Sequence, residues 1–240
     1  MRRLVVFLSI ALLVGCGRNE PPPSSGAQSA QGAQGAQGAQ GAQGAQGAQG
    51  AQTSSTSPRI VFLGDSLTAG LGLPADQSFP SLIGRKLKER GFDYEVVNAG
   101  VSGDTSAGGV RRLDWSLEGD VRVLIVALGG NDGLRGLPPG DLKKNLAAIL
   151  DRAREKKIAV ILAGMEAPPN NGPDYTREFR AVYEQLAAEY KVRLIPFLLQ
   201  GVAGDATLNQ PDGIHPNSRG AEIVAELVWK ELEPALRRPS

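Results

Sequence analysis

Ser66 and His215 are the two residues whose chemistry could make this chain a catalyst. Ser66 lies in a Gly-Asp-Ser turn directly after the apolar residues 60–63, and His215 is the only histidine among the 240 residues. A serine hydroxyl becomes a nucleophile when a neighbouring base accepts its proton. If Ser66 has that role, His215 is the only imidazole that could serve it. Because a lone histidine is more often structural than catalytic, the residues around it have to decide between the two interpretations.

Asp212 lies three residues before His215, close enough in a tight turn to accept a hydrogen bond from the imidazole Nδ1–H. Pro216 favours a helix that starts at its own position, and it keeps His215 outside the helical region. The imidazole would then be oriented by a carboxylate, with its second nitrogen free to accept the Ser66 proton. Ser66, Asp212 and His215 are therefore predicted to form a catalytic triad.

Acyl transfer also needs hydrogen-bond donors for the negative oxygen that forms on the substrate. The candidates are the backbone N–H groups of Ser66 and Gly103 and the side-chain amide of Asn131. Gly103 would let the backbone approach a substrate without a Cβ in the way, and Asn131 offers a neutral NH₂ donor. Each of them could equally be a turn residue chosen for its backbone conformation. Asp104, next to Gly103, is interpreted as a helix N-cap.

These residues need a scaffold that brings them together. Short runs rich in Val, Ile and Leu hardly alternate with polar residues, as is typical of strands buried on both faces; they lie at residues 60–63, 94–97, 121–128, 158–162 and 192–195. Amphipathic helical stretches between them include residues 79–90, 142–156 and 175–190. This alternation predicts a three-layer α/β/α, flavodoxin-like, doubly wound domain with a five-stranded parallel sheet. Ligands bind outside the carboxyl ends of such strands, so the polar, Gly-rich turns there should converge on one rim.

Four motifs, in this order, resemble the GDSL or SGNH hydrolase superfamily: GDSL at residues 64–67, NAGVSGDTSAGG at 98–109, LGGNDGLRG at 128–136 and DGIHPN at 212–217. They are most similar to its bacterial subgroup of multifunctional acyl-CoA thioesterases, arylesterases and lysophospholipases, and the similarity extends from residue 59 to the end of the chain. The resemblance implies the SGNH hydrolase fold, with Ser66 as nucleophile and Asp212 and His215 as its partners. It also implies an oxyanion hole formed by Ser66, Gly103 and Asn131.

The predicted reaction is the cleavage of carboxylic esters or thioesters through an acyl-enzyme, as in an arylesterase, a lysophospholipase or an acyl thioesterase. Leu134, Leu137 and Pro168 are candidate contacts for a small-molecule ester or lipid substrate, although the two leucines could equally pack on the sheet. The acyl chain length stays open at this point. So do two alternatives: a carbohydrate O-acetyl esterase of the same superfamily, and a non-catalytic, tethered binding lipoprotein.

Composition and charge argue against several other classes of protein. The formal net charge is +1, which does not indicate a nucleic-acid surface. The single cysteine, Cys16, rules out an intramolecular disulfide and a thiolate zinc cluster, and one histidine leaves a zinc or iron site short of nitrogen ligands. Residues 70–75 fit G-x-G-x-x-A, but Pro74 interrupts the motif and the strand ends too early for a dinucleotide site. The sequence thus predicts no cofactor, no metal and no nucleic-acid partner, and it implies no protein partner.

The start of the chain has the pattern of a secretory signal. Two arginines, a short and largely apolar run and small residues at its end fill residues 1–15. The apolar run is too short for a helix that spans a bilayer, which needs about 20 residues. Residues 13–16, Leu-Val-Gly-Cys, resemble the bacterial lipoprotein box, which implies that Cys16 is lipidated and becomes the mature N-terminus.

A tether is predicted between the lipid and the enzyme. Residues 26–52 repeat as Gly-Ala-Gln-type triplets, which contain no apolar side chain larger than alanine and cannot form a packed core. The predicted organisation is therefore a signal peptide at 1–15, a lipidated Cys16 with a disordered tether at 16–58, and a hydrolase domain at 59–240. By resemblance to Gram-negative sorting, Gly17 after the cysteine favours the outer membrane, with the domain facing the periplasm.

We expect a Cys16→Ser protein to leave the membrane, because it would lose the two or more acyl chains that anchor a lipoprotein stably. Cells that express the wild-type or the variant chain are fractionated, and the domain is detected in the membrane and soluble fractions. Lipidation of Cys16 is contradicted if both proteins are found in the membrane fraction.

Overall fold

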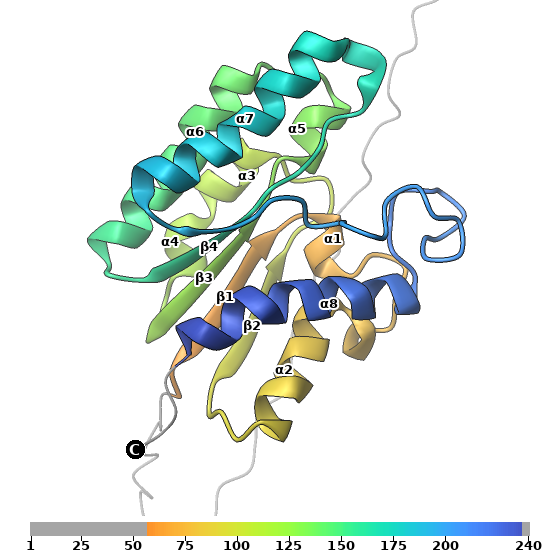
Figure 1. Cartoon of the computed structure of the whole chain (residues 1–240). Coiled ribbons are helices and arrows are strands. Elements are labelled where there is room, and N and C mark those ends of the chain that lie inside the picture. The colour runs from red at the N-terminus through yellow and green to blue at the C-terminus, as the bar shows by residue number, and fades with distance from the viewer. Residues whose placement is uncertain (1–56, 237–240) are drawn as a thin grey trace, which may run out of the picture. The chain divides into compact units, whose positions relative to one another are not determined.

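In the computed structural model, residues 57–236 are described, and they form a parallel sheet with helices on both faces (Figure 1). The predicted signal segment, Cys16 and the triplet repeats of the predicted tether lie outside the described residues. Within residues 57–236, no helix combines the length and the apolar character needed to cross a membrane.

Five parallel strands form the sheet in the order β2-β1-β3-β4-β5. They are β1 (Arg59–Gly64), β2 (Glu95–Gly100), β3 (Val121–Ala127), β4 (Ala159–Ala163) and β5 (Arg193–Ile195). β1 pairs with β2 on one side and with β3 on the other, so the direction in which strands are added reverses at β1. Doubly wound sheets bind ligands at this switch point, outside the carboxyl ends of the strands.

The central strands are apolar because helices cover both of their faces. Residues 60–63 of β1 and 123–127 of β3 are buried along their whole length, so successive side chains enter the core on opposite sides of the sheet. β2 differs from the predicted pattern. Most of its residues are exposed or half-buried, because β2 is the edge strand and has a partner on one side only.

Two helical layers cover the sheet (Figure 1). α2 (Phe79–Glu89) and α8 (Ser218–Leu232) lie on one face, whereas α3 (Ser106–Arg111), α6 (Pro139–Glu155) and α7 (Pro173–Tyr190) lie on the other. The shorter elements are α1 (Ser66–Ala69), α4 (Leu113–Ser116), α5 (Gly130–Leu134) and the 3-10 turns Ala75–Gln77, Pro169–Asn171 and Glu233–Ala235. The predicted three-layer, flavodoxin-like α/β/α fold with five parallel strands is confirmed.

Element boundaries follow the sequence signals with small shifts. Each strand starts within one residue of its predicted start. α8 begins at Ser218, because the side chain of Asn217 caps it by accepting hydrogen bonds from two backbone N–H groups of its first turn. The helix start predicted at Pro216 is therefore wrong by two residues. Pro216 instead forms an antiparallel bridge with Asn209, which holds the loop that carries His215.

Tyr183 fastens the end of β3 to α7. Its side chain is 1 % exposed, and its hydroxyl donates a 2.9 Å hydrogen bond to the carbonyl of Leu128. That carbonyl lies directly before the turn that carries Asn131. Because a buried carbonyl that loses its donor costs about 1–3 kcal/mol, this bond helps to fix the position of the turn.

Tyr183→Phe should lower the free energy of unfolding by about 1–2 kcal/mol, since it removes the donor and leaves the ring. Unfolding in urea measures the change. Tyr190→Phe is the matched control: Tyr190 is half-buried, and its hydroxyl meets the Ala147 carbonyl only at 3.5 Å, so water can replace that bond. An equal change in the free energy of unfolding of the two variants would show that the hydrogen bond from Tyr183 to Leu128 stabilises the fold no more than the bond of Tyr190 does.

Candidate active site

The turn after β1 places Ser66 at the start of a short helix. Asp65 is the N-cap of α1, and its Oδ1 accepts a 3.0 Å hydrogen bond from the N–H of Leu67. An aspartate at this position ends the strand and starts the helix, because its carboxylate satisfies a backbone donor of the first turn. Ser66 is the first helical residue, so its own N–H has no acceptor within the helix.

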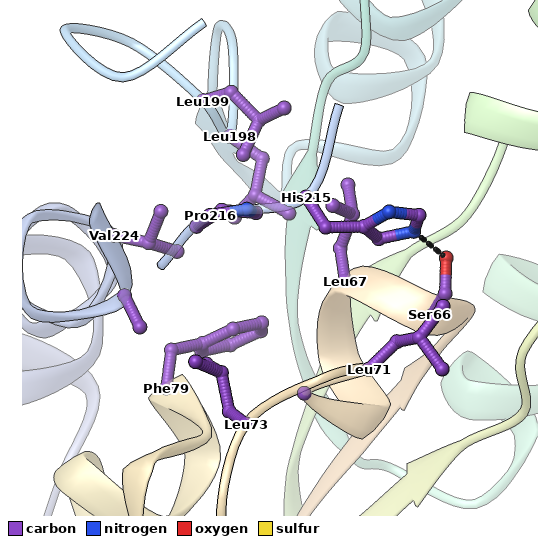
Figure 2. Close-up of a pocket in the computed structure, with 12 residues that line it drawn as sticks. Ser66, Leu67, Leu71, Leu73, Phe79, Leu198, Leu199, His215, Pro216 and Val224 are labelled. Atoms are coloured by element: carbon purple, nitrogen blue, oxygen red, sulfur yellow. Dashed lines mark hydrogen bonds between the residues drawn. The ribbon is translucent and has the colours of Figure 1, made fainter. Parts of the chain in front are cut away.

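His215 contacts Ser66 although it lies 149 residues later in the sequence. Its Nε2 lies 2.8 Å from Ser66 Oγ, and its Nδ1 lies 2.7 Å from Asp212 Oδ2. Figure 2 shows the imidazole directed at the serine hydroxyl, which extends from the start of α1. The structure thus brings together all three residues predicted to form the triad, in the order that proton transfer from serine requires.

A tight turn built on Asp212 fixes the imidazole. Asp212 Oδ1 accepts hydrogen bonds from the N–H groups of Ile214 at 2.9 Å and His215 at 3.0 Å. The two backbone bonds, the one from His215 first, and then the bond to the imidazole lower the pKa of Asp212 to about 2. Asp212 therefore stays ionised well into the acid range. An ionised acceptor at Nδ1 keeps the proton on that nitrogen and leaves Nε2 as the base that faces Ser66.

Apolar side chains border the pair on the side of α2 and α8 (Figure 2). A pocket of about 10 Å³, about enough for one water molecule, lies there. Its lining includes Leu73, Phe79, Leu198 and Val224 together with Ser66 and His215. The imidazole is accordingly only 16 % exposed, which limits the competition of water for its nitrogen atoms.

Gly103 lies in the turn that follows β2. Its φ of +84° is rarely adopted by a residue with a Cβ, so the glycine is needed for the turn as well as for a close approach of substrate. Arg135 Nη2 donates a 2.9 Å hydrogen bond to the Gly103 carbonyl, which restrains the peptide group that follows Gly103.

Asn131 lies in α5, directly after β3. Its Nδ2 donates a 2.9 Å hydrogen bond to the Asp104 carbonyl and a longer one, 3.3 Å, to Asp65 Oδ2. The first bond fixes the plane of the amide. The second is long and can be exchanged for a better acceptor, such as the negative oxygen of a tetrahedral intermediate.

One cavity of about 470 Å³ is lined by Ser66, Gly103, Asn131 and His215, whereas Asp212 is absent from its lining. Leu134 and Pro168 also line this cavity, as predicted for substrate contacts, whereas Leu137 is absent from the lining. The carbonyl of Leu137 accepts a 2.8 Å hydrogen bond from Tyr175, which holds this residue in the turn before α6. Most of the remaining lining side chains are apolar, among them Leu71, Met165, Phe197 and Ile214.

No group of three or more His, Cys, Asp or Glu side chains in residues 57–236 is placed to hold a metal ion.

Asp104 has a different role from the predicted helix N-cap. The N-cap of α3 is Thr105, and the Asp104 carboxylate instead accepts a 2.6 Å hydrogen bond from Arg112 Nε. The prediction is wrong because the local pattern gives no hint of Arg112, whose side chain reaches Asp104 only once α3 has packed on the sheet. Asp132 orders the turn after β3, because its carboxylate accepts hydrogen bonds from the N–H and the hydroxyl of Ser106 at 2.8 and 2.5 Å.

Asp65 is a buried carboxylate next to Ser66, the predicted nucleophile. It is 2 % exposed, and burial raises its pKa to about 6, although the Leu67 N–H bond and the charge of His215 act in the opposite direction. A carboxyl group with a pKa raised on folding favours the folded state most when it is protonated. Asp65 therefore makes the folded domain less stable as the pH rises.

Comparisons with known proteins show which proteins this chain is similar to. The sequence model of the GDSL-like Lipase/Acylhydrolase family matches residues 62–223. Esterase TesA of Pseudomonas aeruginosa is 44% identical over 178 residues, which cover 74% of this chain and 89% of the relative. Thioesterase 1/protease 1/lysophospholipase L1 of Escherichia coli is 37% identical over 182 residues, 75% of this chain and 86% of the relative. The crystal structure of AlinE4, an SGNH-hydrolase family esterase, is 41% identical, with a TM-score of 0.63 over 75% of this chain and 97% of its own.

Asp65→Asn should stabilise the domain more at neutral pH than at acid pH. Between the ordinary pKa of 3.8 and the raised pKa of about 6, the folded wild type loses stability as the pH rises, and the neutral amide does not. Two-state linkage, at about 1.4 kcal/mol per pKa unit, gives a change of about 2 kcal/mol in the difference between the two proteins from pH 4 to pH 7. Urea unfolding at both pH values measures it. A difference that does not vary with pH would mean that Asp65 is ionised as easily in the folded as in the unfolded chain.

Proposed function

This chain belongs to the GDSL-like lipase/acylhydrolase family and is a hydrolase of carboxylic esters, and from this premise we propose that Ser66 is its nucleophile and that the reaction proceeds through an acyl-enzyme. One observation carries the proposal: the 2.8 Å contact between His215 Nε2 and Ser66 Oγ, made at the wall of the 470 Å³ cavity. The hydroxyl, the base and an acceptor for the second imidazole nitrogen are already aligned for proton transfer.

The first half of the reaction transfers the acyl group to Ser66. As Oγ attacks the carbonyl carbon, its proton passes to His215 Nε2, and the electron pair of the C=O bond moves to the oxygen. Donors at Ser66, Gly103 and Asn131 stabilise that oxygen more strongly than the neutral carbonyl, which is the source of the rate enhancement. When the intermediate collapses, the bond to the leaving oxygen or sulfur breaks, and His215 gives its proton to the leaving group.

Water completes the reaction. His215 takes a proton from a water molecule as that water attacks the acyl carbon, and the second tetrahedral intermediate uses the same donors. Its collapse breaks the bond to Oγ, releases the carboxylic acid and returns a proton to Ser66. Asp212, ionised throughout, stabilises the imidazolium that forms in both halves.

The lining of the cavity supports acyl groups larger than acetyl as substrates. Leu71, Leu134, Phe197 and Ile214 give the cavity an apolar wall near the nucleophile, and its volume is within the range of about 300–1,000 Å³ that small-molecule sites occupy. The names of the two relatives describe an esterase and a thioesterase/protease/lysophospholipase. We therefore favour aryl esters, acyl thioesters and lysophospholipids over acetylated sugars, which present more polar surface to the site.

The place of action that we propose is the cell envelope, with the domain held by a lipid on Cys16. The support is the sequence of the first 58 residues, namely the signal pattern, the resemblance to a lipoprotein box and the Gly-Ala-Gln repeats. The predicted tether after Cys16, residues 17–58, has 42 residues, and a Gly-rich flexible chain of that length has an end-to-end distance of roughly 35 Å. The cavity could therefore reach lipids of the same membrane.

Ser66→Ala should remove nearly all hydrolysis of p-nitrophenyl butyrate and leave the fold intact, because it removes the hydroxyl that His215 Nε2 contacts. Ser57→Ala is the matched control, since Ser57 precedes β1 and lies at the opposite end of that strand from Ser66. Initial rates and thermal unfolding of both variants are compared with the wild type. Full activity in a folded Ser66→Ala protein would refute the proposed mechanism.

A further inference from the structure

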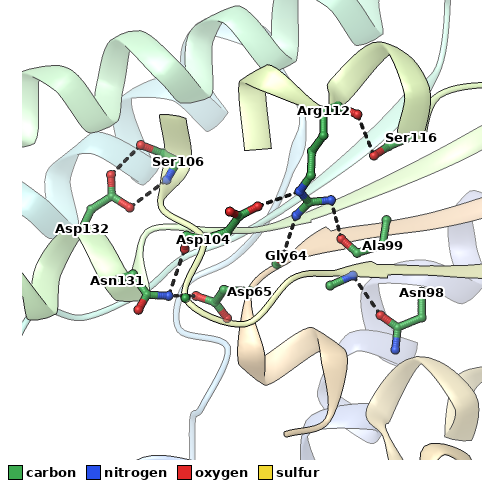
Figure 3. A network of polar contacts seen from close by, with 12 residues as sticks. Gly64, Asp65, Asn98, Ala99, Asp104, Ser106, Arg112, Ser116, Asn131 and Asp132 are labelled. Carbon is green, nitrogen blue, oxygen red and sulfur yellow. Dashed lines mark hydrogen bonds and ion pairs between the residues drawn. The ribbon is translucent and has the colours of Figure 1, made fainter. Parts of the chain in front are cut away.

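Arg112 lies between α3 and α4 and joins the ends of two strands. Its Nη2 donates a 2.7 Å hydrogen bond to the carbonyl of Gly64, the last residue of β1, and its Nη1 donates a 2.6 Å bond to Ala99 in β2 (Figure 3). Gly64 is followed by Asp65 and Ser66, so the guanidinium holds the backbone from which the nucleophile turn departs. The interaction is distinct from the triad, since Arg112 contacts neither Ser66 nor His215 in the bonds that it makes.

The third contact of Arg112 reaches the turn that carries the other donors. Its Nε donates a 2.6 Å hydrogen bond to Asp104 Oδ2, and the carbonyl of the same Asp104 accepts the 2.9 Å bond from Asn131 Nδ2. Gly103 directly precedes Asp104. One guanidinium therefore connects, through Asp104, all three turns on which Ser66, Gly103 and Asn131 lie.

The side-chain type suits this arrangement. A guanidinium presents its donors in a rigid plane and can serve three acceptors in fixed directions, whereas a lysine ammonium is a flexible point charge. The side chains of Arg112 and Asp104 are 16% and 18% exposed, so their ion pair is shielded from most of the solvent. A partly buried network of this kind, in which one guanidinium donates to three separate acceptors, holds geometry better than an exposed ion pair.

Gly108 leaves the space that the Asp104 carboxylate occupies. A Cβ on residue 108 would lie 2.6 Å from Cγ of Asp104, so any larger residue would displace the carboxylate. A glycine inside a helix costs about 1 kcal/mol relative to alanine. The space required by the Asp104 carboxylate, which pairs with Arg112, explains why α3 has a glycine at position 108.

We propose that Arg112 is the positioning residue of the oxyanion hole: by holding Gly64, Ala99 and Asp104 together, it sets the donors of Ser66, Gly103 and Asn131 at the spacing that the tetrahedral intermediate requires. The inference rests on the proposed function. Arg112 touches no substrate and acts through the three turns. Donors that are fixed in advance stabilise the transition state without reorganisation, so their displacement lowers kcat far more than it raises KM.

Steady-state kinetics with p-nitrophenyl butyrate tests the proposal. Arg112→Ala should lower kcat by about 10- to 100-fold, because a displacement of about 1 Å in a catalytic group can cost that much, and KM should change little. Asn131→Ala, which removes a donor outright, should lower kcat by about 100- to 1,000-fold and sets the upper limit. Arg111→Ala is the matched control, since Arg111 is the exposed neighbour in α3, and it should keep the wild-type kcat.

Phenylboronic acid provides a readout that a purely structural role would not move. It adds to a reactive serine as a negatively charged tetrahedral adduct that resembles the intermediate. Its inhibition constant should rise in Arg112→Ala by about the same factor by which kcat/KM falls. Arg112→Lys should recover part of the thermal stability but little of kcat, because one ammonium cannot serve three acceptors.

A second variant covers the case in which Arg112→Ala does not fold. Gly108→Ala keeps both charges and improves helix propensity, yet it displaces the Asp104 carboxylate. It should therefore lower kcat and weaken phenylboronic acid binding in a folded protein. Wild-type kcat and wild-type inhibition in either folded variant would overturn the proposal, as would a loss of kcat in Arg111→Ala equal to that in Arg112→Ala.

The Ser66→Ala protein separates this proposal from the function on which it rests. If Ser66→Ala is inactive and a folded Arg112→Ala is fully active, the positioning role fails and the proposed function stands. If Ser66→Ala keeps full activity, the proposed function fails whatever Arg112 does. A fall in kcat of Arg112→Ala without any change in phenylboronic acid affinity would assign Arg112 to general stability and overturn its role in the oxyanion hole.

Discussion

The 2.8 Å hydrogen bond between His215 Nε2 and Ser66 Oγ joins residues that are 149 positions apart in the chain. It can form only where the turn after β1 meets the loop before α8, and the parallel sheet makes that meeting possible because all of its strands end at the same edge. The apolar interiors of β1 and β3 fix this edge, and the antiparallel bridge between Asn209 and Pro216 fixes the loop. The rest of the domain can be understood as the support of this one contact.

Asp65 and Asp212, two carboxylates close to Ser66 and His215, have pKa values shifted in opposite directions. Asp65 is almost completely buried, and its raised pKa means that the folded domain bears a cost for its charge at neutral pH. Asp212, on the other side of His215, is exposed to solvent and bound by two backbone N–H groups, so its charge is favoured. Two carboxylates on the same site thus have opposite pKa shifts, set by burial in one case and by hydrogen bonds in the other.

The proposed oxyanion donors are held by hydrogen bonds that are separate from those of the triad. Asp132 ties the turn after β3 to the start of α3, and Arg112 ties the ends of β1 and β2 to Asp104 (Figure 3). In the proposed mechanism the triad supplies the proton transfer, and this second network holds the donors in place where negative charge develops. The hydrogen bonds of Arg112 and Asp132 involve neither His215 nor Asp212.

The sequence by itself determined the fold class and pointed to Ser66, Asp212 and His215 as the candidate reacting groups. Largely apolar runs indicated strands covered on both faces, and one histidine with Asp212 before it left a single possible base for Ser66. The sequence could not predict contacts that depend on the direction in which a side chain points after the helices have packed. Asp104 has the local pattern of a helix cap, but its carboxylate pairs with Arg112, and Leu137 lies in a promising loop but lines no part of the cavity. Local propensity acts over a few residues. These contacts form only when α3 and the turns around β3 pack on the completed sheet, and for that reason the tertiary structure alone decided them.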